Sequence, residues 1–212
     1  MSHREPISGA AAYPLPFPVI ALVTSAGGLD ALSRVLTPLP ADLPAAVLVA
    51  QHLDPEKPSI LADLLSARTR LRVRVAAHGD QLEPGLVLVT PPARHLLVTS
   101  EATLGLIDSG DLPPARPSAD ILLVTLAVTC GPRALVVVLT GLGHDAQAGI
   151  RAIHQCGGVI LAQDQASSAH FGMPGAAIKT GLVDAVVPLA GLADAILAHL
   201  ADGKPEPVPR RP

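Results

Sequence analysis

Three side chains of the types that form hydrolase triads lie just after separate apolar runs of this sequence. Ser25, His52 and Asp145 follow the runs at residues 18–24, 46–51 and 134–140. A serine hydroxyl is a poor nucleophile at neutral pH, so it needs a histidine to take its proton and a carboxylate to hold that histidine in the correct tautomer. Triads are defined by geometry and not by chain order. The three residues therefore predict nucleophilic catalysis.

Ser25 lies where its apolar run stops and the small-residue turn Ala26-Gly27-Gly28 begins, just before a helical pattern. A side chain on a sharp strand-to-helix turn stands clear of both elements, and the first amides of the helix point at the group that the serine attacks. This is the arrangement of a nucleophile elbow, although Val23 stands where the G-x-S-x-G motif has its first glycine. The turn favours a nucleophilic Ser25.

Each of the three residues also has a simpler interpretation. Ser25 precedes a helical pattern, and serine is a common helix cap. Taken singly, His52 fits a partly exposed loop histidine, and Asp145 fits a cap of the helix predicted from Ala146. Residues 25–28 resemble a phosphate cradle, but they lack both the G-x-G-x-x-G and the Walker lysine patterns. The occurrence of all three types at strand ends favours the triad.

Metal and disulfide chemistry are not indicated. No two histidines have a metal-ligand spacing on one helix face, and Cys130 and Cys156 are not in a C-x-x-C arrangement. His95 and His144 lie in segments that could line a crevice. We therefore expect no metal, no cofactor and a reduced, cytoplasmic setting.

The elements that must position these residues alternate between β-rich runs and helical patterns. Predicted strands cover residues 19–24, 46–51, 72–76, 86–89, 134–140, 159–162 and 183–187, with a hairpin at 96–107. Predicted helices cover residues 29–36, 59–67, 118–129, 146–155, 174–179 and 192–201. Such alternation predicts an α/β fold: a doubly wound, mostly parallel sheet with helices on both faces and a small β-hairpin insertion. Polar residues that follow the strands meet at the carboxyl edge of such a sheet, where the ligand crevice lies.

Composition limits the partners. The chain of 212 residues is 49% hydrophobic, which suits one domain at residues 17–202, flanked by flexible tails at 1–16 and 203–212. Its net charge of −3 and its three aromatic residues argue against nucleic acid as a partner. Pro14, Pro16 and Pro18 break any signal-peptide helix, and no apolar run is long enough to span a bilayer. We expect a protein or small-molecule partner and no membrane insertion.

Several short motifs occur along the chain in a characteristic order. They are Ser25–Gly28, Leu36–Pro40, Gln51-His52, Pro91–His95, Arg116–Asp120, Leu139–Asp145, Ala162–Asp164 and Phe171–Pro174. In this order, and over most of residues 18–200, the sequence resembles the catalytic domain of the CheB chemotaxis protein-glutamate methylesterases. The resemblance implies a doubly wound α/β domain in which Ser25, His52 and Asp145 match the triad of the family.

The resemblance also implies a substrate and a set of supporting residues. The family hydrolyses γ-methyl esters of glutamate on the cytoplasmic helices of chemoreceptors, releasing methanol, and some members deamidate receptor glutamines. The main chain of Ala26 and Leu142 is expected to form the oxyanion site, and His95 and Arg116 are expected beside the substrate. Leu142 stands where the family usually has methionine. A change of side chain leaves the backbone N–H donor intact.

The chain departs from the family in four places. Val23 and Thr24 replace the usual small Gly-Ala and could crowd the elbow, Ala146 replaces a glycine, and the loop at 108–116 is shortened and altered. Only a short tail precedes the first strand, so we expect phosphorylation control from a separate receiver or kinase protein. These departures leave an alternative: a catalytically weak or inactive signalling module of the same fold.

Overall fold

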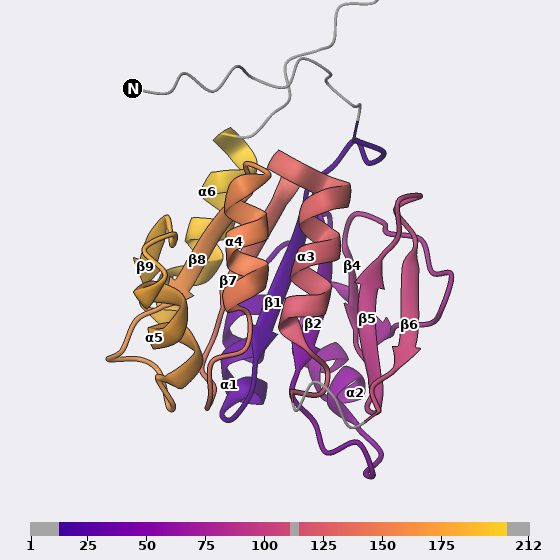
Figure 1. Cartoon of the computed structure of the whole chain (residues 1–212), viewed down its shortest axis with the longest axis horizontal. Helices are drawn as coiled ribbons and strands as arrows, with labels where there is room; N and C mark the ends of the chain where they lie inside the picture. Colours follow the sequence, from indigo (N-terminus) through magenta and orange to yellow (C-terminus); the bar gives the residue numbers. More distant parts are fainter. Residues whose placement is uncertain (1–12, 111–114, 203–212) are drawn as a thin grey trace, which may run out of the picture.

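A seven-stranded parallel sheet runs through the middle of the computed structural model, which describes residues 13–110 and 115–202 (Figure 1). Its strands are β1 (Val19–Thr24), β2 (Ala46–Gln51), β3 (Arg72–Val75), β4 (Leu86–Val89), β7 (Ala134–Val138), β8 (Val159–Gln163) and β9 (Ala185–Val187). They lie in the order β3-β4-β2-β1-β7-β8-β9. The predicted doubly wound sheet is confirmed.

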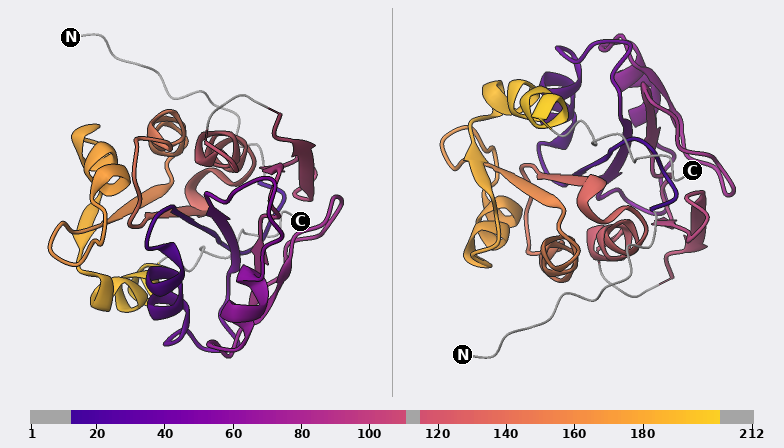
Figure 2. Two further views of the ribbon diagram at one scale, coloured as in Figure 1. Left: turned by 90° about the horizontal axis from the view of Figure 1, so that it is seen from below. Right: turned by 90° about the horizontal axis from the view of Figure 1, so that it is seen from above.

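Helices cover both faces of the sheet (Figure 2). One face carries α1 (Gly28–Leu36), α2 (Leu61–Ser66) and α6 (Leu192–Asp202), and the other carries α3 (Ala119–Cys130), α4 (Gln147–Gln155) and α5 (Gly172–Lys179). Short 3-10 segments, η1 (Gly131–Arg133) and η2 (Leu189–Gly191), lead into β7 and α6. None of the helices within the described ranges is long and apolar enough to cross a lipid bilayer.

The central strand β1 is apolar on both sides because both of its faces are covered. Val19, Ala21 and Val23 point into the core beneath α3 and α4, whereas Ile20 and Leu22 point into the core beneath α1 and α6. A strand buried on both faces reads as a continuous apolar run and not as an alternating one. This is why its bounds could be predicted from sequence.

A separate antiparallel hairpin, β5 (Arg94–Val98) and β6 (Leu104–Asp108), packs beside α3 (Figure 1). Leu96, Val98 and Leu104 join the core beneath that helix. The predicted hairpin insertion is thus confirmed, with both strands slightly displaced from the predicted range.

Several predicted bounds shift by a few residues. Helix α5 begins at Gly172, two residues before the predicted start at Pro174, because a proline in the first turn of a helix gives up no intrahelical hydrogen bond. Strand β7 ends at Val138, two residues before the end of the predicted strand at 134–140.

The two predicted tails fall mostly outside the described residues, as do residues 111–114 of the altered loop. Of the N-terminal segment, Leu15 packs against the core, and Gly131 lies so close to the ring of Tyr13 that a Cβ there would be 2.1 Å from Cζ.

The chain order around β1 creates the crevice. From β1 the chain moves to β2 on one side and returns through β7 on the other, so β1 lies between them. In open α/β sheets the ligand crevice lies at the carboxyl ends of strands where the winding direction reverses. The three strands that precede Ser25, His52 and Asp145 are therefore neighbours.

Candidate active site

Ser25 and His52 lie side by side at the carboxyl edge of the sheet. The last residue pair of strands β1 and β2 is Thr24 with Gln51, so each candidate comes one residue after that pair. The main-chain N–H of His52 donates to the carbonyl of Thr24 at 3.1 Å, which continues the pairing by one residue. Since neighbouring strands run about 5 Å apart, this register makes the serine and the histidine neighbours at the ends of the two strands.

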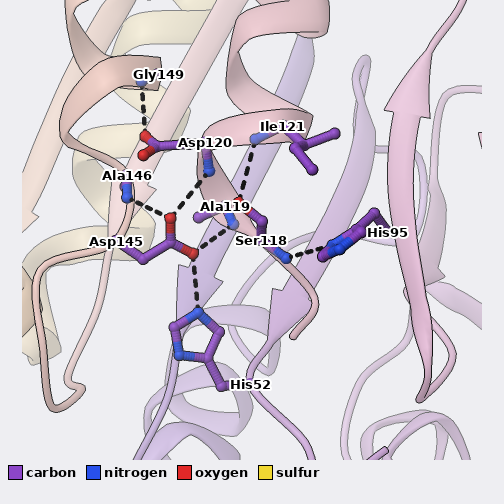
Figure 3. Close-up of polar contacts among 9 residues, drawn as sticks. All are labelled: His52, His95, Ser118, Ala119, Asp120, Ile121, Asp145, Ala146 and Gly149. Atoms are coloured by element: carbon purple, nitrogen blue, oxygen red, sulfur yellow. Dashed lines mark hydrogen bonds and ion pairs between the residues drawn. The ribbon is translucent and has the colours of Figure 1, made fainter. Parts of the chain in front are cut away.

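Asp145 reaches the same edge from the loop after β7 and contacts His52 (Figure 3). The distance from His52 Nε2 to Asp145 Oδ2 is 3.0 Å, and the two side chains are 19% and 9% exposed. Because Nε2 faces the carboxylate, Nδ1 is the ring nitrogen left to accept a proton from a serine.

The carboxylate of Asp145 is held by main-chain donors as well. Oδ2 accepts from the N–H of Ala119 at 2.6 Å, and Oδ1 accepts from Asp120 at 3.2 Å and from Ala146 at 2.9 Å. Ala119 and Asp120 begin α3, whose first amides have no intrahelical acceptor. The carboxylate is thereby fixed in position (Figure 3).

These contacts set the charge of Asp145. Burial by itself would raise the pKa of Asp145, but the hydrogen bonds from His52 and from the main chain of Ala119 and Ala146 outweigh it, so the pKa lies below its usual value. The positive end of the α3 dipole acts in the same direction. Asp145 is therefore ionised at neutral pH and can stabilise an imidazolium.

The two helix-cap interpretations fare differently. The N-cap of α1 is Gly27, with a φ of 81° and no side-chain cap, so Ser25 does not cap that helix. Asp145 does satisfy a helix N-terminus, but it is that of α3 and not that of α4, the helix that follows it in sequence. The same carboxylate that accepts from the amides of α3 also contacts His52, so the cap and the proposed triad are compatible.

The turn of Ser25 is bound to the loop that leads to Asp145. The main-chain N–H of Ser25 donates to the Thr140 carbonyl at 3.0 Å, and the Thr140 hydroxyl donates to the Ala26 carbonyl at 3.0 Å. A Cβ on Gly141 would lie only 2.8 Å from Ser25 Cβ. The hydroxyl of Ser25 has no hydrogen-bond partner among the described residues, and catalytic bonds of this kind often tighten only when substrate binds.

The unusual pair before Ser25 fits its surroundings. Val23 is fully buried in the core beneath α3, so its side chain does not reach the crevice. The hydroxyl of Thr24 donates to the Thr140 carbonyl at 2.7 Å. The Thr24 side chain has room because Gly28 has no side chain: a Cβ there would lie only 2.7 Å from Thr24 Cγ2.

Two main-chain donors beside the triad candidates have no main-chain partner among the described residues, as an oxyanion hole requires. The N–H groups of Ala26 and Leu142 donate to no main-chain acceptor within the described ranges. The Leu142 side chain is 61% exposed and lines a cavity of about 380 Å³ together with His52 and Asp145.

His95 and Arg116 make contacts within the protein. His95 is 1% exposed: its Nδ1 accepts from the main chain of Ser118 at 2.9 Å, and its Nε2 donates to the carbonyl of Ser109 at 3.3 Å. Arg116 is partly exposed and donates to the carbonyl of Gly110 at 3.1 Å. The geometry of His95 favours a role in holding the start of α3 over contact with a substrate.

Two residues that the sequence did not single out belong to the site. Thr140 connects the Ser25 turn to the Asp145 loop, and Asp120 lies in the first turn of α3 beside Asp145. Both fall inside the motifs Leu139–Asp145 and Arg116–Asp120. Each of these motifs also contains a candidate site residue, Asp145 or Arg116. The other polar residues of the same motifs could therefore have been added as candidates from the sequence.

Comparisons with known proteins give a consistent result. The family described as CheB methylesterase matches residues 20–196. A protein-glutamate methylesterase/protein-glutamine glutaminase of Moorella thermoacetica is 43% identical over 184 residues, which cover 85% of this chain and 43% of that protein. The protein-glutamate methylesterase FrzG of Myxococcus xanthus is 39% identical over 184 residues, covering 87% and 55%.

The solved structure of the Thermotoga maritima CheB methylesterase catalytic domain is similar over most of this chain. Its TM-score is 0.82 at 28% identity, and the match covers 86% of this chain and 98% of that domain. The chain spans about half the length of the curated relatives that it matches.

Proposed function

Because this chain belongs to the CheB methylesterase family, we propose that it is a serine hydrolase that removes methyl groups from γ-methyl-glutamate side chains of proteins. The observation that carries the proposal is the 3.0 Å contact between His52 Nε2 and Asp145 Oδ2, next to the Ser25 turn. The catalytic unit is residues 17–202, and it needs no cofactor.

The first half-reaction forms an acyl-enzyme. Ser25 Oγ attacks the ester carbonyl while His52 Nδ1 takes its proton, and ionised Asp145 stabilises the imidazolium. The N–H groups of Ala26 and Leu142 donate to the oxyanion as it forms. The intermediate then collapses, and the imidazolium gives its proton to the departing methoxide, which leaves as methanol.

The second half-reaction restores the enzyme. Water attacks the glutamyl ester of Ser25, His52 takes a proton from the water, and the same proton returns to Ser25 Oγ as the acyl group leaves as glutamate. An amide of glutamine would follow the same path with ammonia as the leaving group, and the Moorella thermoacetica relative is named for that activity as well.

We propose methylated cytoplasmic helices of chemoreceptors as the substrate, and hence a cytoplasmic site of action. The supporting observation is the shape of the site: the cavity beside His52 and Asp145 is open, and exposed Leu142 at its edge suits an apolar contact with a helix surface. Control by a separate receiver or kinase protein is part of the same proposal.

The decisive experiment measures methanol release from a receptor cytoplasmic fragment that carries labelled methyl groups. Ser25→Ala should lower the rate by about 10⁴-fold or more, because His52 and Asp145 have no nucleophile to activate. Ser66→Ala is the matched control, since Ser66 is an exposed serine at the end of α2 and should leave the rate unchanged.

Two results would contradict the proposal. If wild-type protein releases no methanol from the fragment, the substrate is wrong. If Ser25 in the wild-type protein also fails to react with a fluorophosphonate, the chain is the non-catalytic signalling module and not a hydrolase.

A further inference from the structure

Asp120 bonds both to Asp145 itself and to the helix that follows Asp145, although it is not a member of the proposed triad. Its main-chain N–H donates to Asp145 Oδ1 at 3.2 Å, and its own Oδ1 accepts from the N–H of Gly149 at 2.8 Å. Gly149 lies in the first turn of α4, the helix that begins two residues after Asp145. Figure 3 shows this chain of contacts from His52 through Asp145 to Gly149.

The two helices therefore exchange caps. Asp145, just before α4, accepts from the first amides of α3, and Asp120, in the first turn of α3, accepts from an early amide of α4. Both helix N-termini offer amides without intrahelical acceptors. As a result, the loop of Asp145 cannot shift against α3 without breaking hydrogen bonds at both ends.

The helices also approach closely at this point. A Cβ on Gly149 would lie 2.4 Å from the Cβ of Leu123, so Gly149 allows α4 to pack directly on α3. The amide that Asp120 binds thus belongs to a helix that is packed tightly against α3, and not to a mobile loop.

The location of Asp120 is costly for an ordinary cap. It lines the same cavity of about 380 Å³ as His52 and Asp145. Burial raises the pKa of Asp120, and the nearby charge of Asp145 raises it further, so a second ionised carboxylate is disfavoured here. Asparagine or serine would cap α4 without this penalty.

We infer that Asp120 is a positioning residue for the proposed catalytic carboxylate: by tying the start of α4 to α3, it fixes Asp145 and, through Asp145, the ring of His52. The inference rests on the proposed hydrolase function. This positioning role requires the hydrogen bond from Gly149 to Asp120 and not the negative charge of Asp120.

Two variants separate the hydrogen bond from the charge. Asp120→Asn removes the charge but keeps an oxygen that can accept from Gly149, whereas Asp120→Ala removes both. Asp194→Ala is the control, because Asp194 is an exposed carboxylate in the first turn of α6, on the other face of the sheet.

The readout is covalent labelling of Ser25 by a fluorophosphonate, in which Oγ bonds to phosphorus, fluoride leaves and His52 takes the serine proton. This reaction needs the triad but not a methyl ester. Asp120→Ala should lower the maximal labelling rate on the order of 10- to 100-fold while the inhibitor concentration at half-maximal rate changes little, because misplacement affects the reacting geometry. Asp120→Asn should stay within about threefold of wild type for the same reason.

Circular dichroism at the assay temperature must show that each variant is folded. Wild-type labelling in folded Asp120→Ala would overturn the inference, and so would an equal loss in both variants. Labelling of the wild type without methanol release would refute only the methyl-ester substrate. An unreactive wild-type Ser25 would refute the triad and Asp120 together.

Discussion

At the scale of single residues, the site depends on one close approach at the start of α1. Gly28 lies against Thr24, the residue before the proposed nucleophile, with no room for a Cβ between them. The larger residue at position 24 is therefore tolerated because position 28 has no side chain, and a substitution at either residue is felt at the other.

Gly28→Ala should lower the free energy of unfolding by about 1–3 kcal/mol, because the new Cβ would lie 2.7 Å from Thr24 Cγ2 and 2.8 Å from Gln51 Oε1. Urea denaturation measures the loss. In a double-mutant cycle, Thr24→Ala should make the same change less costly, since it removes the closest atom. Additive effects in the cycle would show that the two side chains do not compete for space.

At the scale of elements, the hairpin β5–β6 holds the helix that in turn holds Asp145. His95 on β5 bonds to Ser118, the N-cap of α3, and Ser118 is followed directly by the amides that bind Asp145. A buried histidine with both ring nitrogens engaged acts as a structural connector between two elements.

His95→Ala should therefore act first on stability. It leaves the main-chain N–H of Ser118 and the carbonyl of Ser109 without their partner and empties a buried volume, so the free energy of unfolding should fall by about 2–4 kcal/mol. Chemical denaturation tests this value. A large rise in the KM for methylated receptor with no loss of stability would instead return His95 to the substrate contacts that sequence resemblance implied.

The elements show where sequence reasoning succeeds. The bounds of β1, β2 and β4 follow from apolar runs buried on both faces, a signal carried by each segment itself. The burial of His95 and the second bond of Asp120 depend on how α3 packs against the hairpin and against α4. Those contacts join residues 23 and 29 positions apart, which no local pattern encodes.

At the scale of the whole molecule, the ionisation of two neighbouring carboxylates makes opposite contributions to stability. The pKa of Asp145 is lowered on folding, so its contribution is complete above the unfolded value of about 4 and is lost as the pH falls through the folded value. The pKa of Asp120 is raised, so its ionised form weakens the fold at neutral pH.

Unfolding in urea at a series of pH values should thus separate the two residues. Asp145→Asn should flatten the loss of stability below about pH 4, because the group that gains a proton on unfolding is gone. Asp120→Asn should retain that loss and should be no less stable than wild type at pH 7. An unchanged acid slope in Asp145→Asn would mean that other carboxylates dominate acid unfolding.

The wide separation of the site residues along the chain has a consequence for biosynthesis. The contact between His52 and Asp145 spans 93 positions, and the bond from Thr140 to Ala26 spans 114. A nascent chain that has emerged only through β6 carries the serine and the histidine but neither the carboxylate nor the loop that holds the serine turn. The proposed triad is therefore incomplete until translation has passed β7, and the proposed hydrolase function requires a nearly finished domain.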